Sequence, residues 1–273
     1  MVRMGVIWDR TVAFAGERTG ALVAIALATM VVPGAVSGAL EPLRAAATPG
    51  TRLLLAAVLL VAAILSVLGQ LAVTALALGA AGGFGSALRQ GTGRLPTALG
   101  LALLLLIGLG LLGAPLSAIV FASGGASMDM NGMRVMMTGD WRQRLAIATL
   151  LTTLLMLWLG TRLSVLMPVI VAERRGIRAI PRAFRLTRGV ALRLAGVILL
   201  YGLVVTIVTY AAQTVFGTVA LLIAGNEGKV TVAGAVTALA VSAVGAVFTV
   251  LASIFLALLY RALRAAREGA PAA

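Results

Sequence analysis

Residues 173–196 read ERRGIRAIPRAFRLTRGVALRLAG and lie between two long apolar runs of the chain. This link holds seven arginines, which are Arg174, Arg175, Arg178, Arg182, Arg185, Arg188 and Arg193. Arginine-rich links between apolar segments are typical of the cytoplasmic loops of membrane proteins, because their charge prevents the loop from crossing the bilayer. The stretch therefore predicts a cytoplasmic connection between two membrane-spanning helices.

The composition of the whole chain leads to the same class of protein. Of its 273 residues, 61% are hydrophobic and 11% are charged, whereas soluble domains carry about 25% charged residues. So little charge cannot cover the surface of a water-soluble fold, but a polytopic membrane protein has lipid as its solvent. We therefore expect an all-α, polytopic membrane helical bundle that forms a single integral membrane domain over residues 1–273.

Six apolar runs are long enough to cross the hydrocarbon core, which takes roughly 20 helical residues. The predicted transmembrane helices cover about 20–40, 53–81, 97–122, 145–172, 194–224 and 231–260. Residues 123–144 are predicted to form a loop on the outer side. Residues 261–273 are predicted to form a basic cytoplasmic tail.

The first nineteen residues are more polar than the runs that follow. Trp8, Val12 and Ala15 recur at helical spacing among charged residues, which indicates an amphipathic helix at the membrane surface with Trp8 at headgroup depth. A cleaved signal peptide is the alternative, but the long polar region with acidic residues before the first apolar run argues against it.

The basic residues divide unequally between the two sides of this topology. With a cytoplasmic N-terminus, six basic residues fall in outer loops and fifteen in cytoplasmic segments, the latter being Arg3, Arg10, Arg18, Arg89, Arg94, Arg261, Arg264, Arg267 and the seven of the link. The positive-inside rule then places both termini in the cytoplasm. We expect a multi-pass protein of a bacterial-type cytoplasmic (inner) membrane.

The link is also expected to contain a short amphipathic helix over 180–188, with Pro181 in its first turn. Arg178, Arg182 and Arg185 fall on one sector of this helix, and Ile180 and Phe184 fall on another. We expect the helix to lie on the inner leaflet, with its arginines and the others of the link contacting anionic lipid headgroups. A solvated run of charge is the alternative interpretation.

Several classes of chemistry are disfavoured by residue content. The net charge of +14 could indicate nucleic-acid binding, but the arginines lie between apolar spans and no stacking aromatics accompany them, so no nucleic acid is expected. The chain contains neither cysteine nor histidine, which excludes disulfides, thiolate metal sites and histidine-dependent triads. We expect no cofactor, no metal and no catalytic residue.

One arginine, Arg162, lies within a predicted span. It precedes Glu173 by eleven residues, about 16 Å along a continuous helix, and an exposed arginine at that depth costs at least about 2.5–3.5 kcal/mol. Its partner is expected to be a carbonyl group, water, a lipid phosphate or a polar side chain, the candidates being Gln70, Tyr201, Tyr210 and Gln213. Arg162 is either an intramembrane anion or lipid contact or a hydrogen-bonded brace beside Pro168.

Three stretches of the chain carry a family resemblance. The opening IWDRTVAFAGE, the stretch TRLSVLMPVIVAERRGIRAIPRAFRLTRG and the closing LALLYRALRAAREG are similar to motifs of the glycerophosphoryl diester phosphodiesterase membrane-domain family. The matching positions are Arg162, Leu163, Ser164, Pro168, Glu173, Gly176, Ala183, Leu186, Thr187, Gly189, Tyr260, Arg261, Leu263, Arg264, Glu268 and Gly269. The resemblance implies a six-helix membrane bundle without the histidine-containing catalytic domain to which some relatives are fused.

These observations lead to two functional hypotheses. The first is a non-enzymatic inner-membrane protein acting in envelope or lipid-associated membrane organisation, with membrane lipids as partners. The alternative is a transporter or permease subunit for an anionic or lipidic substrate, with Arg162 lining the pathway. A homo-oligomer or an envelope protein partner is compatible with both, since Gly34/Gly38 and Gly79/Gly83 have the GxxxG spacing that permits close helix contact.

Overall fold

The computed structural model describes residues 3–45, 48–122, 126–129, 132–135, 139–173, 176, 178–224 and 232–268. Arg174 and Arg175, which sequence analysis assigns to the inner leaflet, lie outside these residues. The elements are α1 (Met4–Glu17), α2 (Thr19–Ala26), the π-helix η1 (Leu27–Val31), α3 (Val32–Ala39), α4 (Glu41–Ala45), α5 (Pro49–Ala77), α6 (Phe84–Ala122), β1 (Ala126–Asp129), β2 (Gly132–Val135), α7 (Gly139–Leu163), α8 (Leu166–Glu173), α9 (Ala179–Thr187), α10 (Ala191–Ala224) and α11 (Val232–Glu268).

Six helical segments of the described chain are long and apolar enough to cross a membrane. They are 19–39, 49–77, 84–111, 146–173, 191–222 and 232–267, and each overlaps one of the six predicted spans. The protein is thus a multi-pass membrane protein with an all-α helical bundle, as predicted. The third helix begins at Phe84 rather than near 97, because the segment with Arg89 and Arg94 is helical instead of forming a link.

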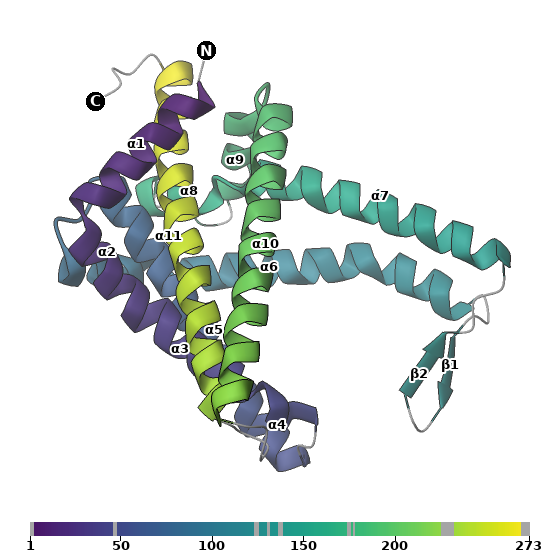
Figure 1. Cartoon of the computed structure of the whole chain (residues 1–273). Helices are drawn as coiled ribbons and strands as arrows, with labels where there is room; N and C mark the ends of the chain where they lie inside the picture. Colours follow the sequence, from purple (N-terminus) through teal and green to yellow (C-terminus); the bar gives the residue numbers. More distant parts are fainter. Residues whose placement is uncertain are drawn as a thin grey trace.

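The loop predicted over 123–144 contains two short antiparallel strands. Strands β1 and β2 pair with each other, so that Ala126 lies opposite Val135 and Asp129 lies opposite Gly132. This hairpin connects α6 to α7 and does not contribute to the helical body (Figure 1).

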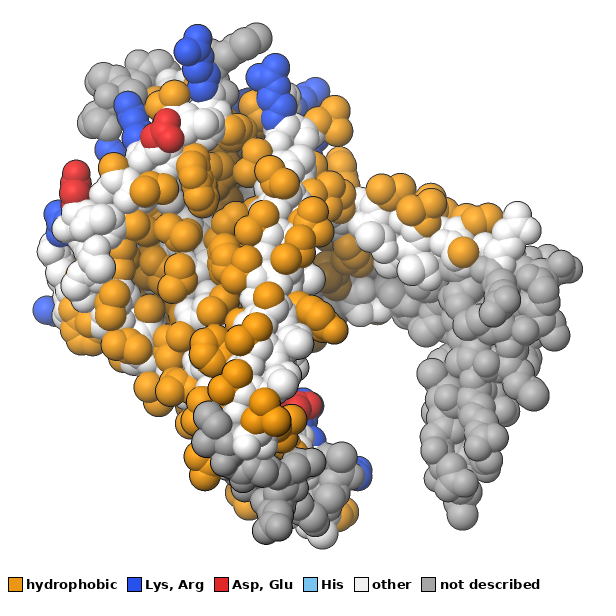
Figure 2. Space-filling model, viewed as in Figure 1, with side chains coloured by type: hydrophobic (Ala, Val, Ile, Leu, Met, Phe, Trp, Pro, Cys, Tyr) orange, Lys and Arg blue, Asp and Glu red, His pale blue; other side chains and the backbone are white. Residues whose placement is uncertain are grey.

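The long helices do not all run in the same direction. In Figure 1, α10 and α11 run side by side in one direction, while α6 and α7 project away together in another. Figure 2 shows arginine side chains gathered near the termini and hydrophobic side chains covering the flank of α10 and α11. An apolar flank between charged ends is the surface expected of a bundle that crosses a bilayer.

The turn between α5 and α6 has the geometry of a helix end that fixes two spans side by side. Gly79 adopts a φ of 72°, its N–H donates to the Leu76 carbonyl, and the Ala80 N–H donates to the Ala75 carbonyl at 3.0 Å. This hydrogen-bond pair is a Schellman motif, which requires a left-handed residue that glycine provides at least cost. The Ser86 hydroxyl, in the first turn of α6, then accepts hydrogen bonds from the N–H groups of Gly82 and Gly83 at 3.1 Å.

The fourth span is broken between α7 and α8, at Ser164–Val165. Pro168 explains the position of the break, since proline has no N–H for the carbonyl four residues earlier, that of Ser164, and its ring crowds that carbonyl. The chain resumes helical bonding where the Val169 N–H donates to the Val165 carbonyl at 3.2 Å. The break thus divides the fourth span into α7 and α8.

The link helix α9 is present as predicted, but protein covers one side of it. Its buried residues are Ala179, Ala183, Leu186 and Thr187, whereas Ile180 and Phe184 are half-buried. Ala179, Ala183 and Leu186 join a core cluster with residues of α8 and α11. The small alanines allow this close approach, so α9 is docked on the bundle rather than resting on lipid through Ile180 and Phe184 alone.

The glycine pairs with GxxxG spacing have different roles in the fold. A Cβ added at Gly34 would lie 2.9 Å from the Ser242 hydroxyl, and one at Gly38 would lie 2.9 Å from the Ala238 Cβ. Gly34 and Gly38 therefore let α3 approach α11 of the same chain. Added Cβ atoms at Gly79 and Gly83 would meet no atom within 4 Å, and Gly79 serves the turn described above.

Candidate functional site

Four segments that are distant in the sequence meet at the end near the termini, which we call the basic end. They are α1, the turn between α5 and α6, the link with α9, and the last turns of α11. A hydrogen bond of 3.0 Å joins Arg18 of the α1–α2 junction to the carbonyl of Gly82, and Arg267 of α11 donates to the carbonyl of Arg188 after α9. All four are segments to which sequence analysis assigns cytoplasmic arginines.

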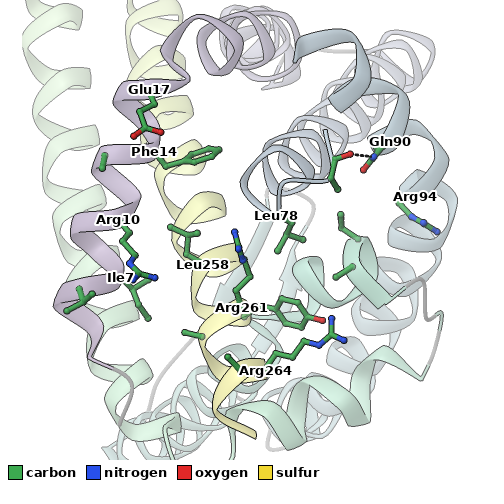
Figure 3. Close-up of a pocket in the computed structure, with 18 of the residues that line it drawn as sticks. Ile7, Arg10, Phe14, Glu17, Leu78, Gln90, Arg94, Leu258, Arg261 and Arg264 are labelled. Atoms are coloured by element: carbon green, nitrogen blue, oxygen red, sulfur yellow. Dashed lines mark hydrogen bonds between the residues drawn. The ribbon is translucent and has the colours of Figure 1, made fainter. Parts of the chain in front are cut away.

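A cavity of about 1380 Å³ lies among α1, α11, the α5–α6 turn, α6 and α8. In Figure 3, Arg10 and Phe14 extend from α1 toward α11, and Arg261 extends from α11 into the same space. Arg94 lies across from them on α6 (Figure 3). The cavity is therefore enclosed by elements that only the tertiary fold brings together.

The charge of the cavity lining is strongly unbalanced. Glu17 supplies a carboxylate, whereas six guanidinium groups come from Arg3, Arg10, Arg89, Arg94, Arg261 and Arg264. Guanidinium groups remain charged at any physiological pH and bind phosphate and carboxylate oxygens through two parallel hydrogen bonds. An anion that enters this cavity is attracted from three helices at once.

The same cavity also has an apolar lining. Val6, Ile7 and Phe14 of α1 face it together with Leu78 of the turn and Leu258 of α11. A site for a small hydrated anion needs no such surface, whereas an amphiphile presents a charged group and carbon chains together. The combination favours an anionic amphiphile as the ligand.

A polar network anchors one wall of the cavity to the link helix. Arg182 of α9 donates from Nε to Glu173 Oε1 at 3.0 Å, and the Tyr260 hydroxyl donates to the same oxygen at 3.0 Å. The Glu173 side chain is 8% exposed and that of Arg182 is 18% exposed. Because Tyr260 also lines the cavity, the network connects the cavity to α9. Arg182 and Glu173 belong to the same link, so this ion pair forms within the link.

Arg162 lies at the end of α7 and reaches the link helix. Its Nη1 donates to the Phe184 carbonyl at 3.4 Å, and its guanidinium carbon lies 5.6 Å from the Trp158 ring centroid. Arg162 Nε is buried and has no hydrogen-bond partner among the described residues. Arg162 thus donates to a backbone carbonyl, and it is not among the residues that line the cavity.

The four polar residues considered as partners of Arg162 lie elsewhere in the described structure, and no hydrogen bond joins them to it. Tyr201 donates to the Phe248 carbonyl of α11 and contacts Trp8, with ring centroids 6.4 Å apart. Gln70 is half-buried on α5, and Gln213 is exposed on α10. Tyr210 is 72% exposed.

The described arginines of the link differ in their surroundings. Arg178, Arg185, Arg188 and Arg193 are exposed, whereas Arg182 is half-buried in the network with Glu173. The exposed four are available to lipid headgroups at the surface of the basic end. None of these five lines the cavity.

The arginines that do line the cavity were assigned only to the cytoplasmic side by sequence analysis and not to a site. Their positions spread from Arg3 to Arg264, so no local motif unites them. The signal that could have found them is their presence in segments sorted to the same side of the membrane, combined with the expectation that α1 lies at the surface.

Comparison with protein families, with characterised proteins and with solved structures yields no match to this chain. The resemblance to the glycerophosphoryl diester phosphodiesterase membrane-domain family stays a prediction. Within the described residues, no group of three or more acidic side chains is placed to hold a metal ion.

Proposed function

We propose that this multi-pass membrane protein binds the headgroup of an anionic lipid in its basic cavity and thereby serves lipid-associated membrane organisation. The observation that carries the proposal is the convergence of six arginines with an apolar surface in one cavity. Basic pockets between membrane helices are a recurrent solution for binding anionic lipid headgroups. We further propose that the role is non-enzymatic and that the basic end faces the cytoplasm.

The depth of the site supports a lipid as the ligand. The cavity lies beside α1, an amphipathic helix with Trp8 and Val12 exposed at 40% and 51%, as expected of a helix at the level of the headgroups. Arginines at that level meet phosphate groups while their apolar neighbours meet the first carbons of the lipid.

The cytoplasmic orientation of the basic end is supported by the excess of arginines on this side of the predicted topology.

The alternative of a transporter with Arg162 in its pathway receives less support. The Arg162 guanidinium is occupied by Phe184 and Trp158, and it lies outside the cavity lining. A transport pathway through Arg162 would need an aqueous route to this side chain. We therefore propose lipid binding in place of transport.

The test is native mass spectrometry of the delipidated protein in neutral detergent, titrated with phosphatidylglycerol or phosphatidylcholine. The cavity variant Arg10→Gln/Arg89→Gln removes a charge from each of two walls. Because each arginine near an anionic headgroup contributes about 1 kcal/mol, this variant should lose about 10–30-fold in affinity for phosphatidylglycerol. The charge-matched control Arg44→Gln/Arg52→Gln, at the opposite end, should bind as the native protein does.

Two outcomes would contradict the proposal. One is equal affinity of the native protein for phosphatidylglycerol and phosphatidylcholine. The other is an equally large loss in Arg185→Gln/Arg193→Gln, whose exposed arginines lie at the basic end but do not line the cavity. That result would mean that the basic surface attracts anionic lipids and that the cavity does not bind them.

A further inference from the structure

The arginines of the cavity are divided among separate walls. Arg10 belongs to α1 and Arg3 directly precedes it, whereas Arg89 and Arg94 belong to α6, and Arg261 and Arg264 to α11. Figure 3 shows Arg10 extending from α1, Arg261 extending from α11, and Arg94 across the cavity on α6. A guanidinium group holds a phosphate oxygen at about 2.7–2.9 Å, so a second phosphate group would give the arginines of these separate walls further oxygens to contact.

The size of the cavity leads to the same conclusion. Its volume of about 1380 Å³ is above the roughly 300–1,000 Å³ of sites that enclose a drug-sized molecule. A single phosphodiester headgroup would leave most of this space to water. A headgroup with a second phosphate, separated from the first by several bonds, would reach both the α1–α11 side and the α6 side.

The charge balance also favours more than one phosphate. Arg94, Arg261 and Arg264 have other interactions within the protein, but Arg3, Arg10 and Arg89 alone, set against the carboxylate of Glu17, exceed the single negative charge of a phosphodiester. Like charges held together in a site of reduced dielectric repel one another, and each added anionic group relieves that repulsion. The preference for two phosphates over one should therefore come from arginines on both sides of the cavity.

We propose that the ligand is a lipid whose headgroup carries two phosphate groups, one held between α1 and α11 and the other by α6. This inference rests on the proposed function, since it specifies the lipid that the same cavity binds. The apolar residues Ile7, Phe14, Leu78 and Leu258 contact the carbon skeleton of the lipid, which distinguishes it from a soluble diphosphate.

The experiment compares lipids with one and two phosphates by native mass spectrometry of the full chain. The first pair is phosphatidylglycerol and cardiolipin. The second pair is phosphatidylinositol and phosphatidylinositol 4-phosphate, which have the same number of acyl chains. In both pairs we expect the two-phosphate lipid to bind about tenfold more tightly, corresponding to one or two additional arginine contacts, with one molecule bound per chain.

The variant Arg89→Gln/Arg94→Gln removes the charges of the α6 wall, and Arg3→Gln/Arg10→Gln removes those of α1. Each should reduce the preference for two phosphates from about tenfold to less than about threefold, because one of the two phosphates loses its partners. Thermal unfolding of both variants shows whether they are folded. If one variant does not fold, the other carries the test, since both are predicted to lose the same preference.

The outcomes separate this inference from the proposed function. Equal binding of one-phosphate and two-phosphate lipids, both above phosphatidylcholine, would overturn the inference and leave the proposed function standing. Binding of no anionic lipid above phosphatidylcholine would overturn both. Displacement of the bound lipid by millimolar inorganic pyrophosphate would overturn the assignment to a lipid and indicate a soluble diphosphate, whereas failure of pyrophosphate to displace it supports the lipid.

Discussion

The guanidinium of Arg162 joins two elements that meet after the break in the fourth span. It donates to the Phe184 carbonyl of α9 at 3.4 Å and lies 5.6 Å from the ring centroid of Trp158. Hydrogen bonds from charged groups contribute about 1.5–3 kcal/mol, and a cation over an aromatic ring adds about 0.5–1 kcal/mol. These contacts brace the end of α7 against the link helix.

Replacement of Arg162 is therefore expected to affect stability before it affects ligand binding. Arg162→Ala should lower the free energy of unfolding by about 1–3 kcal/mol, measured by denaturation in detergent. Arg162→Lys should recover less than half of this loss, because an ammonium group cannot reproduce the planar stacking and fixed donors of a guanidinium. Arg193→Ala, at an exposed position, is the matched control and should unfold as the native protein does.

An unchanged unfolding free energy in Arg162→Ala would contradict the brace. If that variant instead lost affinity for anionic lipids while keeping its stability, Arg162 would be a binding residue. The two readouts thus separate the hypotheses that sequence analysis left open for this side chain.

The surroundings of Arg162 could be predicted only in part. Because Arg162 lies within an apolar span, its guanidinium was expected to have a partner, and a backbone carbonyl was one of the expected partners. Its distance from Glu173 was calculated for a continuous helix, but the helix breaks at Ser164–Val165. Because the carbonyl belongs to Phe184, 22 residues away along the chain, no local pattern identifies it.

At the scale of elements, the first span and α5 approach each other through one glycine. A Cβ added at Gly69 would lie 2.1 Å from the Thr29 hydroxyl and 2.9 Å from the Met30 Cε. Both neighbours are buried in η1, and the Thr29 hydroxyl donates to the Ile25 carbonyl at 2.7 Å. The side chains of the π-helical turn thus pack against α5 at a position where only glycine leaves them enough space.

Gly69→Ala should consequently destabilise the protein, whereas Gly202→Ala should not. The added methyl group at Gly69 forces buried atoms apart, at a cost of about 1–3 kcal/mol. A Cβ at Gly202 of α10 meets nothing within 4 Å, so that variant should be neutral or gain up to about 1 kcal/mol from helix propensity. Unfolding of the two variants side by side in detergent measures the difference.

Equal stability of Gly69→Ala and Gly202→Ala would contradict the close approach of α5 and η1.

The sequence predicts the elements themselves but not all of the contacts between them. The six apolar runs predict the spans, because length and hydropathy alone decide whether a helix can cross the hydrocarbon. The helix that a glycine contacts depends on tertiary packing, as does the contact of Gly34 and Gly38 with α11.

At the scale of the whole molecule, charge sorting predicts which segments share a side of the membrane but not that they form a cavity. The first and last cavity arginines, Arg3 and Arg264, are separated by nearly the whole chain. Their meeting depends on α1 packing along α11 and on the α5–α6 turn reaching the α1–α2 junction through Arg18. Neither contact leaves a periodic signal in the sequence.

We propose above all that the arginine-bearing segments meet on one side of the membrane and that this side faces the cytoplasm. The most direct measurement is labelling of single cysteines in intact cells with a membrane-impermeant maleimide, since the chain contains no cysteine of its own. Four substitutions report on the basic end, and they are Gly16→Cys, Gly82→Cys, Arg185→Cys and Ala266→Cys. Arg52→Cys reports on the opposite end, where α5 begins.

We predict that Arg52→Cys reacts in intact cells and that the four cysteines of the basic end react only after the membrane is permeabilised. Reaction of any of these four in intact cells, or protection of the cysteine at position 52 together with them, would contradict this prediction.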